Sequence, residues 1–411
     1  WFMTYSDESR HAIVKAWTDA GAKVGWMEFD AFDFPQFHAK PSAPANAIPT
    51  FQFDVWKDDM LSKLPDPGVP FGLFFWQTKM PEAGLKELAR LKNLRLLNLQ
   101  GTPVTQEGLK ELAGMQNLQS LDLTGKVTDA DLKELSCLKN LQSLSLTELT
   151  DEGIKELAHF KSLRSLGVGA ELHRPRVTDA GLKHLAGIKG LTALSLYSDE
   201  LTDAGLKELA GLTNLHALSL YASKHVTDAG IKHLSGLKNL RALHLCYSQV
   251  SDQGLKELAG LTNLHTLNLL GTLVWGDEMQ QLAGLKGLRS LNLGGTKVRS
   301  VGLKDFAESL EELNLGYTQV TEAGLRRLHY LKKLKSLSLY NTPTTDEGLK
   351  ELAALKSLQS LDLSTTRVTD AGLQELAVLQ NLETLNVRST KVTPKGVARL
   401  QNELPKCRIE R

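Results

Sequence analysis

The chain has 411 residues, so it must form several domains or one elongated array of repeats. Its 48 Lys and Arg residues balance 47 Asp and Glu residues, and a net charge of +1 gives no field that would attract nucleic acid or an acidic membrane. Three cysteines far apart and without CxxC spacing indicate neither a disulfide framework nor a zinc ribbon, and they leave the compartment open.

No apolar run reaches the roughly 18 to 20 residues that a membrane span needs, and no signal-peptide pattern is visible. We therefore expect no membrane span in this chain. It starts at Trp1 rather than Met, as expected of a sequence that lacks its natural beginning, and we expect Arg411 to be the natural C-terminus.

The first 76 residues differ in composition from the rest, because they hold five of the six tryptophans and ten of the twelve phenylalanines. This concentration of aromatic residues indicates a separate packing unit. Residues 6–20 have the pattern of a capped helix that stops at Gly21, and residues 23–29 that of a strand. We expect residues 35–49, which are rich in Pro and Ala, to form a loop.

Two aromatic segments follow, "TFQFDVW" and "FGLFFW", and they place Phe53 and Phe75 22 residues apart. We interpret them as degenerate strands at the start of a repeat array. Residues 1–50 are then an N-terminal α/β cap that shields the first leucine layer. The alternative is that this aromatic unit forms a ligand pocket.

A pattern L-x-x-L-x-L occurs thirteen times, from Leu94, Leu97 and Leu99 to Leu382, Leu385 and Val387. Seven of the twelve intervals between units are 24 residues, which indicates a solenoid. The L-x-L part predicts a short strand whose alternate side chains point inward. Such a small unit cannot bury its apolar face alone, so neighbouring units must stack.

The segment "VTDAGIKHLSGL" after one of these strands predicts a helix. Thr227 is placed to cap it, Asp228 lies in the first turn where the helix dipole favours an anion, and Ile231, Leu234 and Leu237 recur at a spacing of three. Asp and Glu recur in the same frame in other repeats, which favours helix caps and a solvated face over paired catalytic carboxylates.

The segment "TDAGLKELAGLTNLHALSL" resembles the leucine-rich repeat family, in its bacterial branch with repeats of about 24 residues, and is similar to the ribonuclease-inhibitor-like and F-box-associated classes. The resemblance covers about residues 70–411. It implies an α/β horseshoe with parallel strands on the concave face and helices on the convex face, and a size that suits a protein partner. We expect a solenoid over 51–392 and a C-terminal cap over 393–411 that ends in a short strand, 407–409.

Candidate catalytic and metal sites are few. His244 and Cys246 lie two apart on one predicted strand and could form a base and nucleophile, but such residues stand nearly 7 Å apart. His216 and His265 occupy equivalent positions two repeats apart, roughly 10 Å, which is too far for a shared zinc ion. No glycine-rich phosphate motif is present. We therefore predict no enzyme, no cofactor and no metal.

The outward strand positions indicate where a partner would bind. The column before the second leucine is mostly Ser or Ala, a small polar floor, and the middle column is mostly Asn or Ser. The column after the last leucine carries Tyr197, Tyr221, Cys246 and Leu270 in successive repeats, with Tyr247 beside Cys246. An aromatic and aliphatic ridge against a small polar floor is typical of an interface hot spot. Tyrosines that merely pack on one another along the strands are the alternative.

Two irregularities lie near this ridge. One interval is four residues longer than usual and places Arg174 in a rim loop, and Trp275 with Gly276 replaces the usual Thr-Asp helix start. Trp275 is a candidate rim anchor, and filling of a local packing gap is the alternative.

The sequence thus predicts a non-enzymatic recognition scaffold that binds a protein or peptide on its concave face. The predicted contact residues are Tyr197, Tyr221, His244, Tyr247, Leu270, Arg174 and Trp275. One alternative is a ligand or glycan sensor that uses the aromatic N-terminal unit, and another is a structural solenoid that self-associates.

Overall fold

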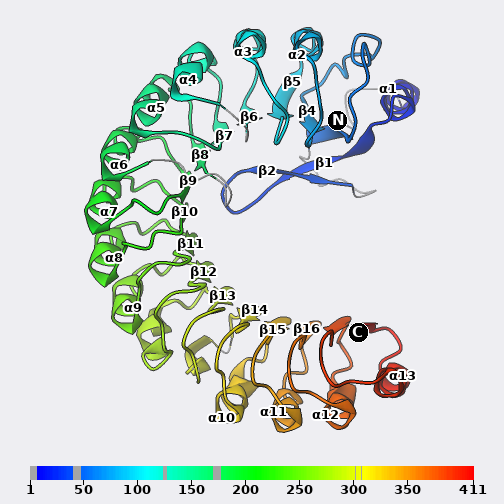
Figure 1. Cartoon of the computed structure of the whole chain (residues 1–411), viewed down its shortest axis with the longest axis vertical. Helices are drawn as coiled ribbons and strands as arrows, with labels where there is room; N and C mark the ends of the chain where they lie inside the picture. The colour runs from blue at the N-terminus through cyan, green and yellow to red at the C-terminus, as the bar shows by residue number, and fades with distance from the viewer. Residues whose placement is uncertain (1–6, 40–47, 124–126, 170–176, 301, 307) are drawn as a thin grey trace. The chain divides into compact units, whose positions relative to one another are not determined.

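The structure, a computed structural model, describes residues 7–39, 48–123, 127–169, 177–300, 302–306 and 308–411. The chain divides into two compact units. The first consists of Trp1–Glu200 with Asn214–Leu218, and the second of Leu201–Thr213 with Ser219–Arg411. Within each unit the strands lie side by side along one face and the helices cover the other (Figure 1). We call the side of the strands that faces away from the helices the strand face.

The strands of the first unit are β1 Lys23–Phe29, β2 Pro35–His38, β3 Ile48–Phe53, β4 Phe71–Phe75, β5 Leu94–Asn98, β6 Ser120–Leu123, β7 Ser143–Leu146, β8 Ser165–Val168 and β9 Ala193–Tyr197. Its helices are α1 Asp7–Asp19, α2 Glu82–Leu88, α3 Gln106–Ala113, α4 Asp129–Leu135, α5 Asp151–Glu156 and α6 Asp179–Leu185, with the 3-10 turn η1 Leu157–His159. Strands β3 to β9 pair in parallel, one neighbour after another.

The N-terminal segment adds an antiparallel element to this parallel array. Strand β1 has the predicted bounds and pairs antiparallel with both β2 and β3. The predicted loop over 35–49 is therefore wrong at both ends, because β2 starts at Pro35 and β3 at Ile48. Proline is tolerated at the first position of an edge strand, where its missing N–H breaks no ladder bond.

The aromatic residues of this segment form one core. Trp17 on α1 is fully buried and stacks on Phe51 with a ring separation of 4.2 Å, while Phe71 meets its edge at 5.8 Å. The indole N–H donates to the Pro65 carbonyl at 3.0 Å, so its polar atom is satisfied. Strands β3 and β4 pair in parallel at Phe53 and Phe75, whose rings also stack.

The strands of the second unit are β10 Ala217–Tyr221, which begins in the first unit, β11 Ala242–His244, β12 Thr266–Asn268, β13 Ser290–Asn292, β14 Glu312–Asn314, β15 Ser336–Ser338, β16 Ser360–Asp362, β17 Thr384–Asn386 and β18 Arg408–Glu410. Its helices are α7 Asp203–Leu209, α8 Asp228–Leu234, α9 Asp252–Leu258, α10 Glu322–Arg326, α11 Asp346–Leu352, α12 Asp370–Glu375 and α13 Pro394–Glu403. The 3-10 turns are η2 Met279–Gly284, η3 Lys304–Phe306, η4 Arg327–Tyr330 and η5 Leu376–Val378.

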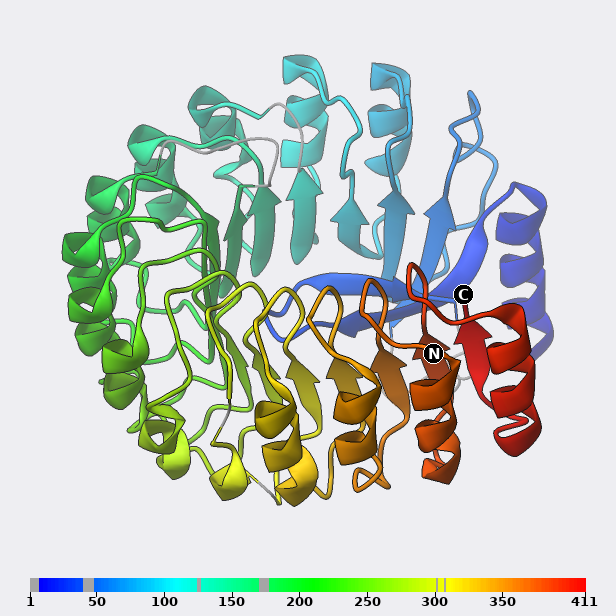
Figure 2. The same cartoon turned by 60° about the horizontal axis from the view of Figure 1, so that its bottom comes forward.

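The strands of the second unit from β11 to β18 are parallel and in register, and Figure 2 shows their arrowheads pointing the same way. Leu243, Leu267 and Leu291 stand directly beside one another and are at most 1% exposed. Full burial of each such leucine contributes about 1.5–3 kcal/mol. The predicted α/β solenoid is thus confirmed, with the final strand one residue later than predicted.

A carboxylate joins each of several helices to the next repeat. Asp228, in the first turn of α8, accepts from the Ser251 N–H at 2.8 Å and from its hydroxyl at 2.6 Å, and Ser251 caps α9. The same pair of bonds joins Asp129 to Thr150, Asp151 to Thr178, Asp203 to Thr227, Asp346 to Thr369, and Asp370 to Thr393. These bonds hold the pKa of Asp370 below its usual range. The recurrent Asp therefore caps across the repeat boundary as well as along its own helix.

The glycine two residues after Asp in the repeat is required by this same contact. At Gly254 a Cβ atom would overlap the Asp228 carboxylate oxygen and would approach Val250 to 2.9 Å. Only a residue without a side chain leaves room for the carboxylate of the preceding repeat. The spacing T-D-x-G thus reflects the hydrogen bonds between the Asp carboxylate of one repeat and the cap residue of the next.

The ladder of carboxylates is interrupted after Asp252, which still accepts from the backbone N–H groups of Trp275 and Gly276 at 3.0 and 3.1 Å. Gly276 occupies the position of the next carboxylate and cannot continue the ladder. The 3-10 turns η2 and η3 replace α-helices in this stretch, and the buried Ser300 hydroxyl has no hydrogen-bond partner among the described residues.

Candidate functional site

A turn follows the strands of the second unit, and one residue of each turn adopts a positive φ of between 51° and 68°. This left-handed column consists of Ala222, Tyr247, Gly271, Gly295, Tyr317, Asn341, Thr365 and Ser389. Glycine adopts this conformation without strain, and asparagine tolerates it. A tyrosine there is unusual, because its Cβ crowds the following carbonyl at a cost of about 1–2 kcal/mol.

The two tyrosines of the column are exposed, Tyr247 by 47% and Tyr317 by 56%. Each ring meets a second tyrosine edge-on. Tyr221 and Tyr247 have ring centroids 5.2 Å apart, and Tyr317 and Tyr340 have centroids 4.8 Å apart with a hydrogen bond of 3.1 Å from the Tyr317 hydroxyl to the Tyr340 oxygen. These four residues are called the tyrosine ridge.

Glycine in the next turn makes room for one ring of the ridge. A Cβ atom at Gly271 would lie 2.5 Å from a ring carbon of Tyr247. The turn backbone is already paired, since the Tyr247 N–H donates to Leu270 and the Tyr317 N–H to Tyr340, both at 2.8 Å. The ridge thus offers ring surface and hydroxyl groups rather than open backbone groups.

The predicted ridge included Cys246 in an outward column, and this is wrong, because Cys246 is 1% exposed. Strand β11 ends at His244, so the alternation of side chains ends there and both Leu245 and Cys246 turn into the core. Tyr247, one residue later, is the exposed group. The predicted polar floor is also largely covered in the first unit, where Ser120, Ser143 and Ser165 are at most 6% exposed.

The pKa values of His244 and Cys246 do not suit a base and a nucleophile. Burial lowers the pKa of His244 to about 4 and raises the pKa of Cys246 to about 11. Near neutral pH the thiol therefore keeps its proton, and thiolate rather than thiol is the nucleophile.

The low pKa of His244 predicts a pH dependence of stability. Its folded-state value of about 4 lies below the unfolded value near 6.5, so the unfolded chain binds a proton first as the pH falls. The stability of the folded state that depends on a neutral His244 is fully present above about pH 6.5. It is lost as the pH falls from there to about 4. We expect the second unit to lose on the order of 3 kcal/mol of stability, as measured by hydrogen exchange, and we expect a shallower pH slope in His244→Asn. Equal slopes in both proteins would contradict it.

The other predicted contact residues are dispersed. Leu270 is half-buried at the turn after β12, and Trp275 is 46% exposed with the Lys297 ammonium 4.9 Å above its ring. Tyr197 is half-buried and ends β9 of the first unit. Arg174 lies outside the described residues.

A second feature lies on the strand face of the first unit, where the β1–β2 hairpin crosses the parallel strands. The hairpin tip is anchored at several points. The Ser165 hydroxyl donates to the Phe32 carbonyl at 2.7 Å, and Asp33 lies 3.3 Å from the His216 ring nitrogen. Phe34 lies against β8, where a Cβ atom at Gly167 would come within 2.9 Å of its ring.

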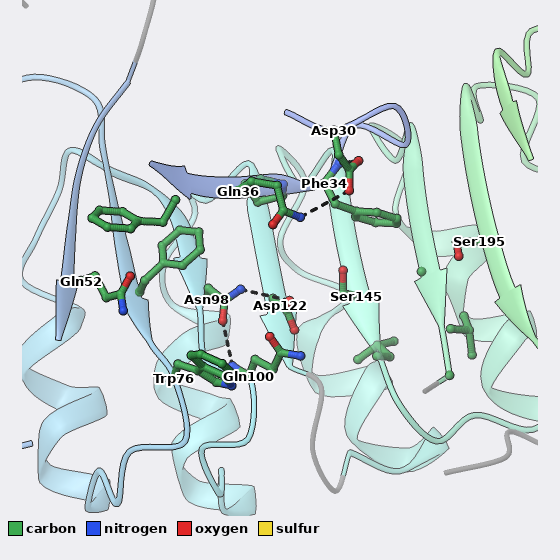
Figure 3. A pocket seen from close by; sticks show the side chains of 17 residues that line it. Asp30, Phe34, Gln36, Gln52, Trp76, Asn98, Gln100, Asp122, Ser145 and Ser195 are labelled. Atoms are coloured by element: carbon green, nitrogen blue, oxygen red, sulfur yellow. Dashed lines mark hydrogen bonds between the residues drawn. The ribbon is translucent and has the colours of Figure 1, made fainter. Parts of the chain in front are cut away.

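Between this hairpin and the strands is a cavity of about 480 Å³, called the hairpin cavity (Figure 3). Its polar lining includes Asp30, Gln36, Asn98, Gln100, Asp122 and Ser145. The Asn98 amide donates to Asp122 at 3.1 Å, while the Asn98 oxygen accepts from the Gln100 backbone at 2.9 Å. Trp76, 59% exposed, borders the same space.

Sequence reasoning missed the hairpin cavity, because its walls come from residues far apart in the chain. One signal was available at Gly167, in the middle column of the strands. The other repeats carry a polar residue in that column, and glycine there leaves room for a ring from elsewhere. Tyr317 was missed too, although Gly271 and Gly295 mark its column.

Among the residues that the structure describes, no three His, Cys, Asp or Glu side chains are grouped so that they could hold a metal ion. Likewise, none of the helices in the described ranges has the length and apolar character needed to cross a bilayer.

The repeating strand-and-helix units agree with a family model, since the Leucine Rich repeat matches residues 354–377 and 378–400. The chain is built of leucine-rich repeats. The fold of this leucine-rich repeat protein resembles that of the mouse RP105/MD-1 complex, at 17% identity over 82% of this chain and 71% of that chain, with a TM-score of 0.50.

Two bacterial structures are also similar. An internalin from Listeria monocytogenes is 26% identical over 80% of this leucine-rich repeat protein and 82% of its own chain, with a TM-score of 0.49. A leucine-rich repeat protein of Leptospira interrogans is 24% identical over 87% of this chain and 100% of its own, with a TM-score of 0.47. No curated protein sequence matches.

Proposed function

We propose that this leucine-rich repeat protein is a non-enzymatic scaffold that recognises a protein or peptide, and that the tyrosine ridge is its contact surface. The supporting observation is that Tyr247 and Tyr317 hold a left-handed backbone while their rings stay about half exposed. Strain of this kind gathers at functional positions. Glycine would adopt this turn without strain, and the two exposed rings supply a binding surface that glycine, or the Ala222 and Ser389 of the same column, would not.

The chemistry of the ridge favours a protein partner. Tyrosine is enriched among residues that dominate binding energy, because it offers a large rigid surface and a hydroxyl group at a low entropic cost. Exposed Leu273 and Trp275 extend the apolar surface in the repeat after Tyr247. We include Leu270 as a further contact position of the second unit and His244 as a neutral polar one, whereas Tyr197 belongs to the first unit and stays outside the proposed surface.

Two further considerations support a recognition role. Leucine-rich repeat proteins are typically non-enzymatic recognition scaffolds, and RP105, whose fold is similar, is found in a complex with MD-1. A weakly basic His244 and a Cys246 thiol that keeps its proton also speak against the one catalytic pair that the sequence suggested.

The test compares partner capture by three proteins: the wild type, the double variant Tyr247→Gly with Tyr317→Gly, and Tyr330→Ala. Tyr330 is a matched control, because it is also exposed, at 39%, but lies on η4 outside the ridge. We expect a protein retained from lysate of the source organism by the wild type and by the control to be lost from the double variant. For the purified pair we expect a loss in affinity of about 30-fold or more. Equal retention by all three would exclude the ridge as the site.

We expect the same double variant to keep its folding stability, which would separate an effect on binding from an effect on folding. Glycine relieves a left-handed strain of about 1–2 kcal/mol per position, while loss of each edge-on ring contact costs about 0.5–1.5 kcal/mol. These contributions nearly cancel, so we expect thermal unfolding to show a change of less than about 1 kcal/mol. A loss of several kcal/mol would mean that the ridge exists for packing.

A further inference from the structure

We propose that the hairpin cavity of the first unit binds a neutral saccharide, one that places a sugar ring against Trp76. This inference is independent of the tyrosine ridge, which belongs to the second unit. It concerns a different class of ligand, a small polyhydroxylated molecule, and it depends on the hairpin as the roof of the site.

The charge of the described cavity lining favours a neutral ligand over an anionic one. Among the described residues that line it there are two carboxylates, Asp30 and Asp122, and no Lys or Arg. A phosphate or a carboxylate ligand would meet this negative charge without a compensating cation among the described lining residues, which costs free energy in a partly desolvated site. A neutral ligand rich in hydroxyl groups meets no such penalty.

The polar groups suit hydroxyl ligands. Carboxylates accept hydrogen bonds only, whereas amides both donate and accept, so a mixture of the two can satisfy hydroxyl groups that do both. Asn98 and Asp122 are held together by their hydrogen bond of 3.1 Å, and Gln36 donates to Asp30 at 3.3 Å. These contacts fix side chains before a ligand arrives, which lowers the entropic cost of binding.

One amide that lines the cavity is available for a ligand. The Gln100 side chain makes no hydrogen bond to any part of the chain that the structure describes, is exposed, and lies beside Trp76 in Figure 3. It can therefore donate to and accept from a ligand without breaking an existing bond.

Trp76 supplies the apolar half of the site. Its indole is 59% exposed beside the cavity, and Phe34 and Phe74 add apolar surface elsewhere in the lining. A pyranose ring has a face of C–H groups that can pack on an aromatic ring, while its edge carries hydroxyl groups for the amides and carboxylates. A volume of about 480 Å³ lies within the range of small-molecule sites, about 300–1,000 Å³.

The experiment is isothermal titration calorimetry of the whole chain with neutral oligosaccharides of glucose, mannose, galactose and N-acetylglucosamine. A sulfated oligosaccharide and a lysine-rich peptide are the charged comparisons. We expect at least one neutral oligosaccharide to bind, and Trp76→Ala and Gln100→Ala each to weaken it, Trp76→Ala by about tenfold or more. Both residues are exposed, so neither variant should unfold the chain.

Two control variants keep the test specific. Trp275→Ala removes another exposed tryptophan, in the second unit, and Tyr247→Gly with Tyr317→Gly removes the ridge; both should bind the oligosaccharide as the wild type does. The proposal is overturned if no neutral oligosaccharide binds at millimolar concentration, if Trp76→Ala binds unchanged, or if the sulfated sugar or the peptide binds better.

Discussion

Trp17→Ala is expected to destabilise the first unit by about 3–5 kcal/mol, the largest single effect predicted for this chain. Trp17 is fully buried, stacks on Phe51, and donates its indole N–H to Pro65. Alanine would leave a cavity among aromatic rings and a buried carbonyl without its donor. Hydrogen exchange measured unit by unit should show the loss in β3, β4 and their neighbours.

Trp76→Ala provides the control for this result. Trp76 comes directly after strand β4 and is 59% exposed. Its removal should therefore change the free energy of unfolding by less than about 0.5 kcal/mol. If Trp17→Ala costs no more than Trp76→Ala, the aromatic cluster is not the core of this end of the chain.

The second large effect concerns the carboxylate ladder of the second unit. Gly254→Ala should cost about 1–3 kcal/mol, because the new methyl group overlaps the Asp228 carboxylate. Asp228→Ala should cost about 1.5–3 kcal/mol, because Ser251 loses the charged acceptor for both its N–H and its hydroxyl.

The double variant Asp228→Ala with Gly254→Ala gives the more decisive test. With Asp228 shortened to alanine, the methyl group at residue 254 enters vacated space, so the two losses should not add. We expect the double variant to be more stable than additivity predicts by about 1 kcal/mol or more, measured by chemical denaturation. Gly236→Ala is the control, since a Cβ atom there meets nothing within 4 Å. Strict additivity would show that the carboxylate and the glycine do not compete for space.

Periodic features of the fold were predictable from the sequence, because each repeats the same physical requirement. A leucine such as Leu243 must be buried in every unit, so its spacing reveals strand, helix and stacking together. The hairpin strand at Pro35–His38 was not predictable in this way. It is short, begins with proline, and is defined by pairing with β1 and by docking of Phe34 against Gly167.

The candidate sites also differ in how far the repeat pattern of the sequence reveals them. Tyr221 and Tyr247 stand out in sequence because aromatic residues recur in neighbouring repeats, but the end of β11, which decides that Tyr247 rather than Cys246 is exposed, is not visible there. The hairpin cavity depends on a long-range contact that no local pattern encodes, so Asp30 and Asn98 could not be connected in advance.

The ladder of carboxylates also bears on how such a chain can grow and diverge. Asp228 lies in the first turn of its own helix and also bonds the cap of the following helix, and Gly254 leaves room for it, so its own repeat alone explains neither residue fully. A duplication can preserve this pairing only if it copies a whole period, and a substitution on one side of a boundary should be compensated on the other. The heritable module therefore includes the junction, and a grafted repeat should bring an Asp that meets a glycine at the start of the helix after it.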